Sequence, residues 1–167
     1  MGLAGAQGVY GVTPDLATYA KAIGAGTALS ALGGRREYMD LIADGRVVHA
    51  GSLNGNPVSL AAAKAAMEYL ADPANDVYPR IERLGARLRS GLEAILRGAG
   101  HEVLTQGAAA VFQVAFRREP ARNYRETLTS DHRKYSDFAL ALLDEGVIVL
   151  PDGRWYISAA HTEEDIE

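Results

Sequence analysis

Cysteine is absent from this sequence, and lysine is scarce. Without cysteine the chain has no disulfide framework, no thiolate nucleophile and no zinc–thiolate site. The absence fits a reducing compartment, and we therefore expect a cytoplasmic protein. Only three of the 17 basic residues are lysines, namely Lys21, Lys64 and Lys134. The charged surface is built mainly from arginine, so a lysine in an apolar, glycine-rich setting is a candidate for a chemical role.

Strong charge of one sign and long apolar runs are missing as well. The net charge is −4 at pH 7, which leaves no basic excess for nucleic acid and no acidic block typical of a disordered tail. No apolar run approaches the roughly 20 residues of a membrane-spanning helix. Residues 1–7 lack the basic start and apolar stretch of a secretory signal. We therefore expect neither nucleic acid nor a membrane as a partner.

The sequence does have the composition of an ordinary globular domain. Hydrophobic residues make up 48% of its 167 residues and charged residues 23%, which suits one domain with a core and is short for two. Helix and strand signals together predict an α/β fold. Strands are expected at residues 16–19, 30–33, 47–50, 102–104 and 111–116, with a hairpin at 147–157. Helices are expected at residues 35–43, 58–70, 77–97 and 135–145, with a polar loop at 117–129.

Residues 162–165 have the pattern of a helix start. Thr162 can cap the helix, and the three acidic residues after it carry the negative charge that a helix N-terminus favours. An isolated helix needs several turns to be stable. Because the sequence stops shortly after this point, we expect the 167 residues to be a portion of a longer chain.

Lys21 stands directly after a predicted strand and is surrounded by small, apolar residues. Its neighbours include Ala20, Ala22, Ile23 and Gly24, and no carboxylate lies close to it in the sequence. An amine attacks a carbonyl carbon only when it is unprotonated, and small neighbours let the backbone approach a flat ring closely. Lys21 is therefore a candidate nucleophile, and the alternative is an ordinary surface lysine after a strand.

Residues 51–57 combine a turn with a predicted helix start. Gly51, the hydroxyl of Ser52 and the backbone amides before the helix form a plausible cradle for a phosphate group. Asn56 can cap the helix, and Pro57 suits its first position. The alternative is an ordinary loop and helix cap that bind no ligand.

Five stretches of the chain carry motifs in a fixed order, at residues 8–16, 20–26, 33–35, 49–57 and 157–166. Together they resemble the class III aminotransferases, closest in look to the glutamate-1-semialdehyde aminomutase branch, over essentially the whole chain. The resemblance implies part of a PLP-dependent transferase of fold type I. Residues 1–70 would be the C-terminal part of the large domain that binds pyridoxal 5'-phosphate (PLP). Residues 77–167 would be an incomplete small C-terminal α/β domain.

The resemblance also implies roles for three residues. Lys21 matches the lysine that forms the internal aldimine with PLP and then moves a proton between the substrate α-carbon and the cofactor. Ser52 matches the residue, often threonine, that donates to the cofactor phosphate across a dimer interface, and Gly51 takes the neighbouring backbone position. The family further implies a homodimer, in which Ser52 reaches the cofactor of the other subunit, and a small-molecule amino substrate, either an amino acid or an amino-aldehyde.

The chain departs from the family pattern in small and in large ways. Ala20 stands where glycine is common before the lysine, and Ala25 interrupts a run of three glycines; we expect both changes to be tolerated. The phosphate loop of the family, its ring-stacking aromatic and its aspartate at the pyridine nitrogen belong upstream of residue 1. Without that aspartate the electron-sink strength of the ring falls, so we expect these 167 residues to be inactive alone.

Two hypotheses of function follow from these observations. The first is a PLP-dependent transaminase or aminomutase, of which this chain is the C-terminal part. The second is a non-catalytic, truncated α/β module that only folds, dimerises or binds a partner.

The remaining motifs are weaker indicators of function. The run at residues 24–29 lacks the strand–helix order of a dinucleotide-binding fingerprint. The four histidines lack metal-ligand spacing, so no metal is expected. The arginines after residue 79 are interpreted as the solvated face of a helix, and they comprise Arg80, Arg83, Arg87 and Arg89.

Overall fold

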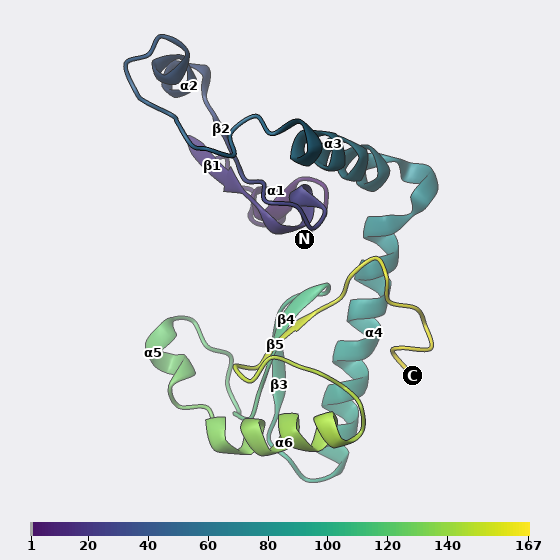
Figure 1. Cartoon of the computed structure of the whole chain (residues 1–167). Coiled ribbons are helices and arrows are strands. Elements are labelled where there is room, and N and C mark those ends of the chain that lie inside the picture. The colour runs from purple at the N-terminus through teal and green to yellow at the C-terminus, as the bar shows by residue number, and fades with distance from the viewer. Residues whose placement is uncertain (1) are drawn as a thin grey trace. The chain divides into compact units, whose positions relative to one another are not determined.

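The structure is a computed structural model that describes residues 2–167 (Figure 1). It divides into two compact units, Gly2–Asp76 and Val77–Glu167, which we call the first and the second unit. Both units contain helices and strands, which confirms the predicted mixed α/β composition. Their assignment to a large and a small domain stays a prediction.

The first unit is built from short elements around a two-stranded sheet. β1 (Leu16–Tyr19) and β2 (Ala31–Gly34) pair antiparallel, with Tyr19 opposite Ala31. The helical elements are α1 (Gly5–Tyr10), the 3-10 helix η1 (Lys21–Gly24), α2 (Arg36–Ala43), α3 (Pro57–Ala71) and the 3-10 helix η2 (Pro73–Asn75). The first two predicted strands and the first two predicted helices are confirmed to within one residue at each end.

Few side chains of the first unit are buried. Among its described residues, Ala63 is the one buried hydrophobic side chain, 3% exposed, and Ser59 is the one buried polar side chain, 9% exposed. Large apolar side chains lie exposed instead, among them Tyr10 at 72% and Val48 at 85%. Since burial of apolar surface is the main source of folding free energy, this unit gains little of its stability from a core of its own.

The second unit combines a three-stranded antiparallel sheet with two long helices. β4 (Val111–Ala115) is the central strand, between β3 (Leu104–Ala108) and β5 (Arg154–Tyr156). The helices are α4 (Val77–Gly98), α5 (Tyr124–Thr127) and α6 (His132–Asp144). The expected strand at 111–116 and the helices at 77–97 and 135–145 are confirmed, although α6 begins three residues early.

The main core of the second unit lies between α4, α6 and one face of the sheet. Phe112 and Trp155 stack across β4 and β5 with their ring centroids 6.0 Å apart. Trp155 Nε1 donates to the Tyr135 hydroxyl at 3.1 Å, and this hydroxyl donates to the Leu150 carbonyl at 3.1 Å. Burial raises the pKa of the Tyr135 hydroxyl, so the hydroxyl stays protonated and remains a donor near neutral pH.

Helix α4 comes very close to the backbone between β3 and β4. A Cβ at Gly85 would collide with the Ala109 carbonyl, so glycine is required there although it is a poor helix former. Leu84, the preceding residue, is 1% exposed and belongs to a second buried cluster with Ala110 and Ile157. The absence of a side chain at Gly85 is therefore what lets this cluster close.

Arg80 and Arg89 of α4 are partly buried and bind other segments of the second unit, which corrects the interpretation of these two as part of a solvated face, whereas Arg83 and Arg87 are exposed. Arg80 Nη2 donates to the Ala159 carbonyl at 2.5 Å. Arg89 donates to Thr105 Oγ1 at 3.1 Å and to the Gly107 carbonyl at 2.8 Å. The helical spacing placed these arginines on one helix, but their partners lie on segments distant in sequence.

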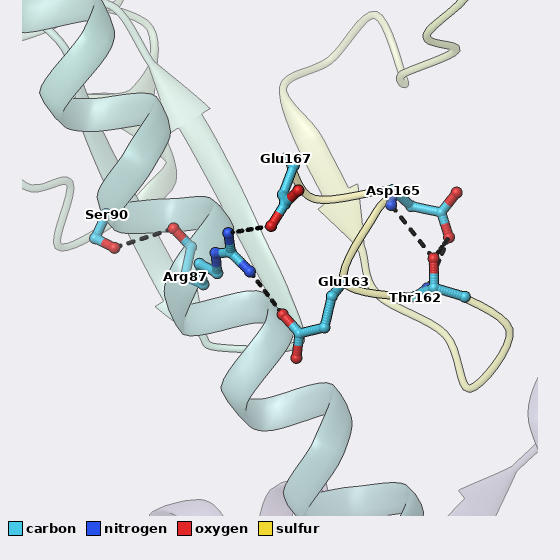
Figure 2. Close-up of polar contacts among 6 residues, drawn as sticks. All are labelled: Arg87, Ser90, Thr162, Glu163, Asp165 and Glu167. Atoms are coloured by element: carbon cyan, nitrogen blue, oxygen red, sulfur yellow. Dashed lines mark hydrogen bonds and ion pairs between the residues drawn. The ribbon is translucent and has the colours of Figure 1, made fainter.

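Arg87 of α4 holds the C-terminal segment. Its guanidinium donates to Glu163 Oε2 at 2.8 Å and to Glu167 Oε1 at 2.9 Å (Figure 2), and these bonds raise the pKa of Arg87. The Thr162 amide donates to Asp165 Oδ2 at 2.7 Å, and the Asp165 amide donates to Thr162 Oγ1 at 3.4 Å. This reciprocal pattern has the bonding of a capping box, as expected of Thr162, but residues 161–167 form a turn and no helix follows in the described chain.

The predicted hairpin at residues 147–157 is wrong. β5 pairs with β4, and residues 147–150 form no strand. Gly146, just past α6, has a left-handed φ of 84°, and the Val147 amide donates to the Leu142 carbonyl at 2.8 Å. The amide of Val147, the first residue of the apolar run at 147–150, therefore bonds the last turn of α6 instead of pairing in a sheet.

Other differences from the sequence-based expectations have similar local causes. Residues 47–50 form no strand, and the Val47 amide donates to the Leu41 carbonyl at 2.8 Å just past α2. The strand expected at 102–104 lies further along the chain, as β3. The expected loop at 117–129 contains the one-turn helix α5, because the Asn123 side chain accepts from the Glu126 amide and caps it.

We predict that Leu84→Ala destabilises the second unit strongly. The residue is 1% exposed, and removing a buried leucine side chain costs about 2–5 kcal/mol because of lost burial and the cavity left behind. Leu140→Ala, at a side chain 62% exposed, serves as the control and should cost about 0.5 kcal/mol or less. Urea unfolding followed by Trp155 fluorescence measures both, and equal losses in the two variants would contradict this picture of the core.

Glu93 on α4 provides a second test. Its Oε1 accepts from the Thr105 amide at 2.6 Å and from Thr105 Oγ1 at 2.7 Å, and Arg97 Nη2 lies 3.1 Å from its Oε2. Burial alone would raise the pKa of Glu93, but the Thr105 hydrogen bonds and the arginine charge outweigh it and leave the pKa lowered.

Because the folded-state pKa of Glu93 lies below its unfolded value, the carboxylate stabilises the fold above an unfolded pKa of about 4.3. This stabilisation is lost as the pH falls through the folded pKa. We predict that Glu93→Gln is less stable than the parent at neutral pH and that the difference shrinks on acidification below about pH 4.3. Urea unfolding at a series of pH values measures it, with the exposed Glu164→Gln as the control. A pH-independent difference would rule out the carboxylate as its source.

Candidate functional site

Lys21 begins η1 immediately after β1 and adopts an unusual backbone conformation. Its φ is 61°, in the left-handed region that residues with a Cβ rarely adopt. Its side chain is exposed and has no carboxylate partner among the ion pairs of the described residues. Strained conformations of this kind cost on the order of 1–3 kcal/mol, persist only where the surroundings enforce them, and cluster at functional sites.

Several contacts hold the turn that starts at Lys21. The Ala25 amide donates to the Ala22 carbonyl at 3.2 Å. The Thr27 amide and Thr27 Oγ1 both donate to the Gly24 carbonyl, at 2.8 Å and 2.6 Å. Ala25 itself has a φ of 48°, so two non-glycine residues of this turn are left-handed.

The second candidate segment is the turn that carries Gly51 and Ser52. The Asn54 amide donates to the Gly51 carbonyl at 3.0 Å, and a Cβ at Gly51 would come within 2.9 Å of Asn54 Oδ1. Gly51 therefore keeps the turn free of a side chain where a ligand could approach the backbone. Ser52 is exposed, and its hydroxyl makes no hydrogen bond within residues 2–167.

Asn56 ends this turn and starts α3. Its Oδ1 accepts from the Val58 amide at 3.1 Å and from the Ser59 amide at 3.0 Å, and Pro57 occupies the first helical position. The predicted cap is confirmed. These two amides of α3 are consequently occupied, as are the Asn54 and Asn56 amides, which donate to the Gly51 and Leu53 carbonyls.

An open cavity of about 510 Å³ adjoins the turn. Its polar lining residues include Ser30, His49, Asn54 and Asn56. Sequence-based reasoning did not single out His49 or Ser30 as cavity residues, because only the folded chain brings their segments to the start of α3. Lys21, Gly51 and Ser52 do not line this cavity, so their joint participation in one site stays a prediction.

Within residues 2–167, sites other than Lys21 and the turn of Gly51 and Ser52 have little support. Residues 2–167 contain no cluster of three histidine, aspartate or glutamate side chains arranged to hold a metal ion. No helix in this range is long and apolar enough to cross a membrane. Asp131 and His132 have structural roles in or beside α6: Asp131 caps the helix, and His132 Nε2 lies 3.2 Å from the Thr127 carbonyl.

Both units are mixed α/β, and the first carries an exposed lysine on a strained turn and an unpaired serine hydroxyl beside a helix start. These features agree with the comparison with protein families, in which the family described as aminotransferase class-III matches residues 1–162. The chain belongs to this family.

Individual relatives and solved structures resemble the chain over nearly its whole length. It is 38% identical to the glutamate-1-semialdehyde 2,1-aminomutase 2 of Brevibacillus brevis, over 99% of this chain and 39% of the relative. An omega-transaminase from Sphaerobacter thermophilus has a similar structure, with a TM-score of 0.88 and 31% identity, over 96% of this chain and 37% of that chain. A transaminase solved with PLP bound has a TM-score of 0.81 and 28% identity, over 97% of this chain and 37% of that chain. The chain therefore spans less than two fifths of the length of these relatives.

We predict that Asn56→Ala loosens the start of α3. Loss of a helix cap costs about 1 kcal/mol, so amide exchange at Val58 and Ser59 should accelerate about fivefold. Asn56→Asp keeps the accepting oxygen and should exchange like the parent. Hydrogen exchange followed by NMR measures both, and equal exchange in the alanine variant and the parent would show that the side chain does not hold the helix start.

Proposed function

We propose that this chain is the lysine-bearing portion of a PLP-dependent enzyme that transfers an amino group, or moves it within a molecule, on an amino acid or amino-aldehyde. The observation that carries the proposal is Lys21. By the resemblance of its motif, Lys21 would correspond to the cofactor lysine of the class III family, to which the chain belongs. A similar solved structure is a transaminase with PLP bound, and the Lys21 side chain is exposed on a strained turn without a carboxylate partner among the ion pairs of the described residues.

The residues present fit the cofactor at two points. The ε-amine of Lys21 is accessible to an aldehyde, and an amine is the group that bonds such a carbonyl carbon. The free hydroxyl of Ser52 and the side-chain-free backbone at Gly51 suit a phosphate oxygen. When bound, PLP supplies an electron sink for negative charge at the substrate α-carbon.

Within this proposal each residue has a distinct role. Lys21 would hold the cofactor by its aldehyde, and its amine would hold the proton that leaves or returns to the substrate α-carbon. Ser52 donates its hydroxyl proton to a phosphate oxygen, and Gly51 keeps the neighbouring backbone accessible. We also propose that the enzyme is a homodimer in which Ser52 reaches the cofactor of the other subunit, as the family resemblance implies.

A second candidate function is a non-catalytic module that folds, dimerises or binds a partner. One observation favours it, namely that large apolar side chains of the first unit such as Val48 and Tyr10 lie exposed, as at surfaces that bind another protein segment. The two functions differ in one measurable property, which is whether Lys21 bonds PLP in this chain.

We predict that the purified chain mixed with PLP develops a visible absorbance band that Lys21→Ala abolishes. The band would report a bond between the amine and the cofactor aldehyde. Lys64→Ala, at an exposed lysine of α3, is the matched control and should keep the band. If parent and both variants give the spectrum of free PLP, the chain alone does not bind the cofactor, and the non-catalytic function is favoured.

A further inference from the structure

The open cavity of about 510 Å³ at the start of α3 has no role in the proposed function, because none of the three candidate residues lines it. Part of its wall is apolar and contains Leu29, Leu53 and Leu60. The polar part consists of Ser30, His49, Asn54, Asn56 and Ser59. None of the described lining residues is acidic. The cavity therefore combines an apolar wall with hydrogen-bonding groups and no negative charge.

Ser59 is the polar lining residue that water reaches least. It is 9% exposed, and its hydroxyl makes no hydrogen bond within residues 2–167, although its backbone amide donates to Asn56 Oδ1 at 3.0 Å. Nearly all buried polar groups in proteins have a hydrogen-bond partner. Because Ser59 lines the cavity, the partner of its hydroxyl has to come from the cavity side.

The start of α3 favours a negatively charged partner. Asn56 Oδ1 is occupied by the Val58 and Ser59 amides, so the group that Asn56 has left is its Nδ2, a hydrogen-bond donor. The first turn of this 15-residue helix contains no acidic side chain. The partial positive charge of the helix N-terminus is therefore not offset by a carboxylate of its own first turn.

A carboxylate suits this cavity better than a phosphate does. The backbone amides that bind phosphate at other helix starts are occupied here, since the Leu60 amide also donates, to the Asn56 carbonyl at 3.0 Å. Among residues 2–167, no lysine or arginine lines the cavity to offset the higher charge of a phosphate. A carboxylate carries a single charge, and the apolar wall suits a short hydrocarbon chain attached to it.

We propose that the cavity at the start of α3 is a binding site for a small aliphatic carboxylate. The Ser59 hydroxyl and Asn56 Nδ2 donate to the carboxylate oxygens, and the leucines of the wall pack against the carbon chain. The site is separate from the turn of Lys21, and it needs no cofactor. Because the cavity is open and lacks a lysine or arginine, we expect a dissociation constant on the order of millimolar.

Titration of the whole chain with butyrate, followed by NMR of the backbone amides, tests the proposal. Butyramide has nearly the same shape without the charge, and inorganic phosphate has charge without the carbon chain. The amides of Ser59 and Leu60 should shift saturably with butyrate, and both comparison compounds should bind about tenfold more weakly or less. Sodium chloride keeps the ionic strength constant, and PLP is left out.

Three variants locate the site. Ser59→Ala removes the hydroxyl without enlarging the side chain and should weaken butyrate binding about tenfold, as loss of a hydrogen bond to a charged group does. Asn56→Asp keeps the oxygen that caps the helix but places a negative charge at the cavity, so it should abolish saturable binding. Ser52→Ala removes a hydroxyl outside the cavity and should bind butyrate like the parent.

Amide exchange at Leu60 checks that the start of α3 stays folded in each variant, and Ser59→Ala decides the question if Asn56→Asp unfolds it. Equal affinity for butyrate and butyramide would overturn the carboxylate site in favour of an apolar pocket. Tighter binding of phosphate than of butyrate would overturn it in favour of a phosphate site. Absence of saturable shifts with butyrate, or equal binding by the parent and Ser59→Ala, would also overturn it.

Discussion

The contact between α3 and η1 is the interaction on which the candidate site depends. The first unit buries few side chains, and those of Ser59 and Ala63 belong to α3. Asn56 caps the start of α3, and Lys21 begins η1. The contact therefore joins the helix that follows the Gly51–Ser52 turn to the turn that begins with Lys21.

The two units are stabilised in different ways. The second unit has a core that extends from α4 and α6 onto the sheet, and arginines on α4 bind segments distant in sequence. The first unit exposes apolar side chains such as Tyr10, Val48 and Val58 at 71–85%. Apolar side chains left in water add little to the stability of this unit, since burial of apolar surface is the main source of folding free energy.

Sequence patterns predicted the helices well because helical periodicity and caps are local signals. Helix α4, the cap at Asn56 and the hydrogen bond from the Thr162 amide to Asp165 all appear where expected. The apolar runs after α2 and α6 were mistaken for strands, since the bond from the Val147 amide to the Leu142 carbonyl depends on where the preceding helix ends. Lys21 was found from its neighbours and its family motif. Its strain, and the cavity at Ser30 and His49, depend on contacts that no local pattern encodes.

The strain at the Lys21 turn shows the structural effect of one departure from the family pattern, the alanine at residue 25. Ala25, which interrupts a glycine run, has a φ of 48°, and Lys21 has a φ of 61°. A left-handed residue with a Cβ costs about 1–2 kcal/mol relative to its ordinary conformation, so an alanine at residue 25 adds strain that a glycine would not. The two Thr27 bonds to the Gly24 carbonyl and the packing of α3 oppose that strain. The turn is thus held by contacts on both sides against its own backbone preference, which keeps the backbone at Lys21 in its left-handed conformation.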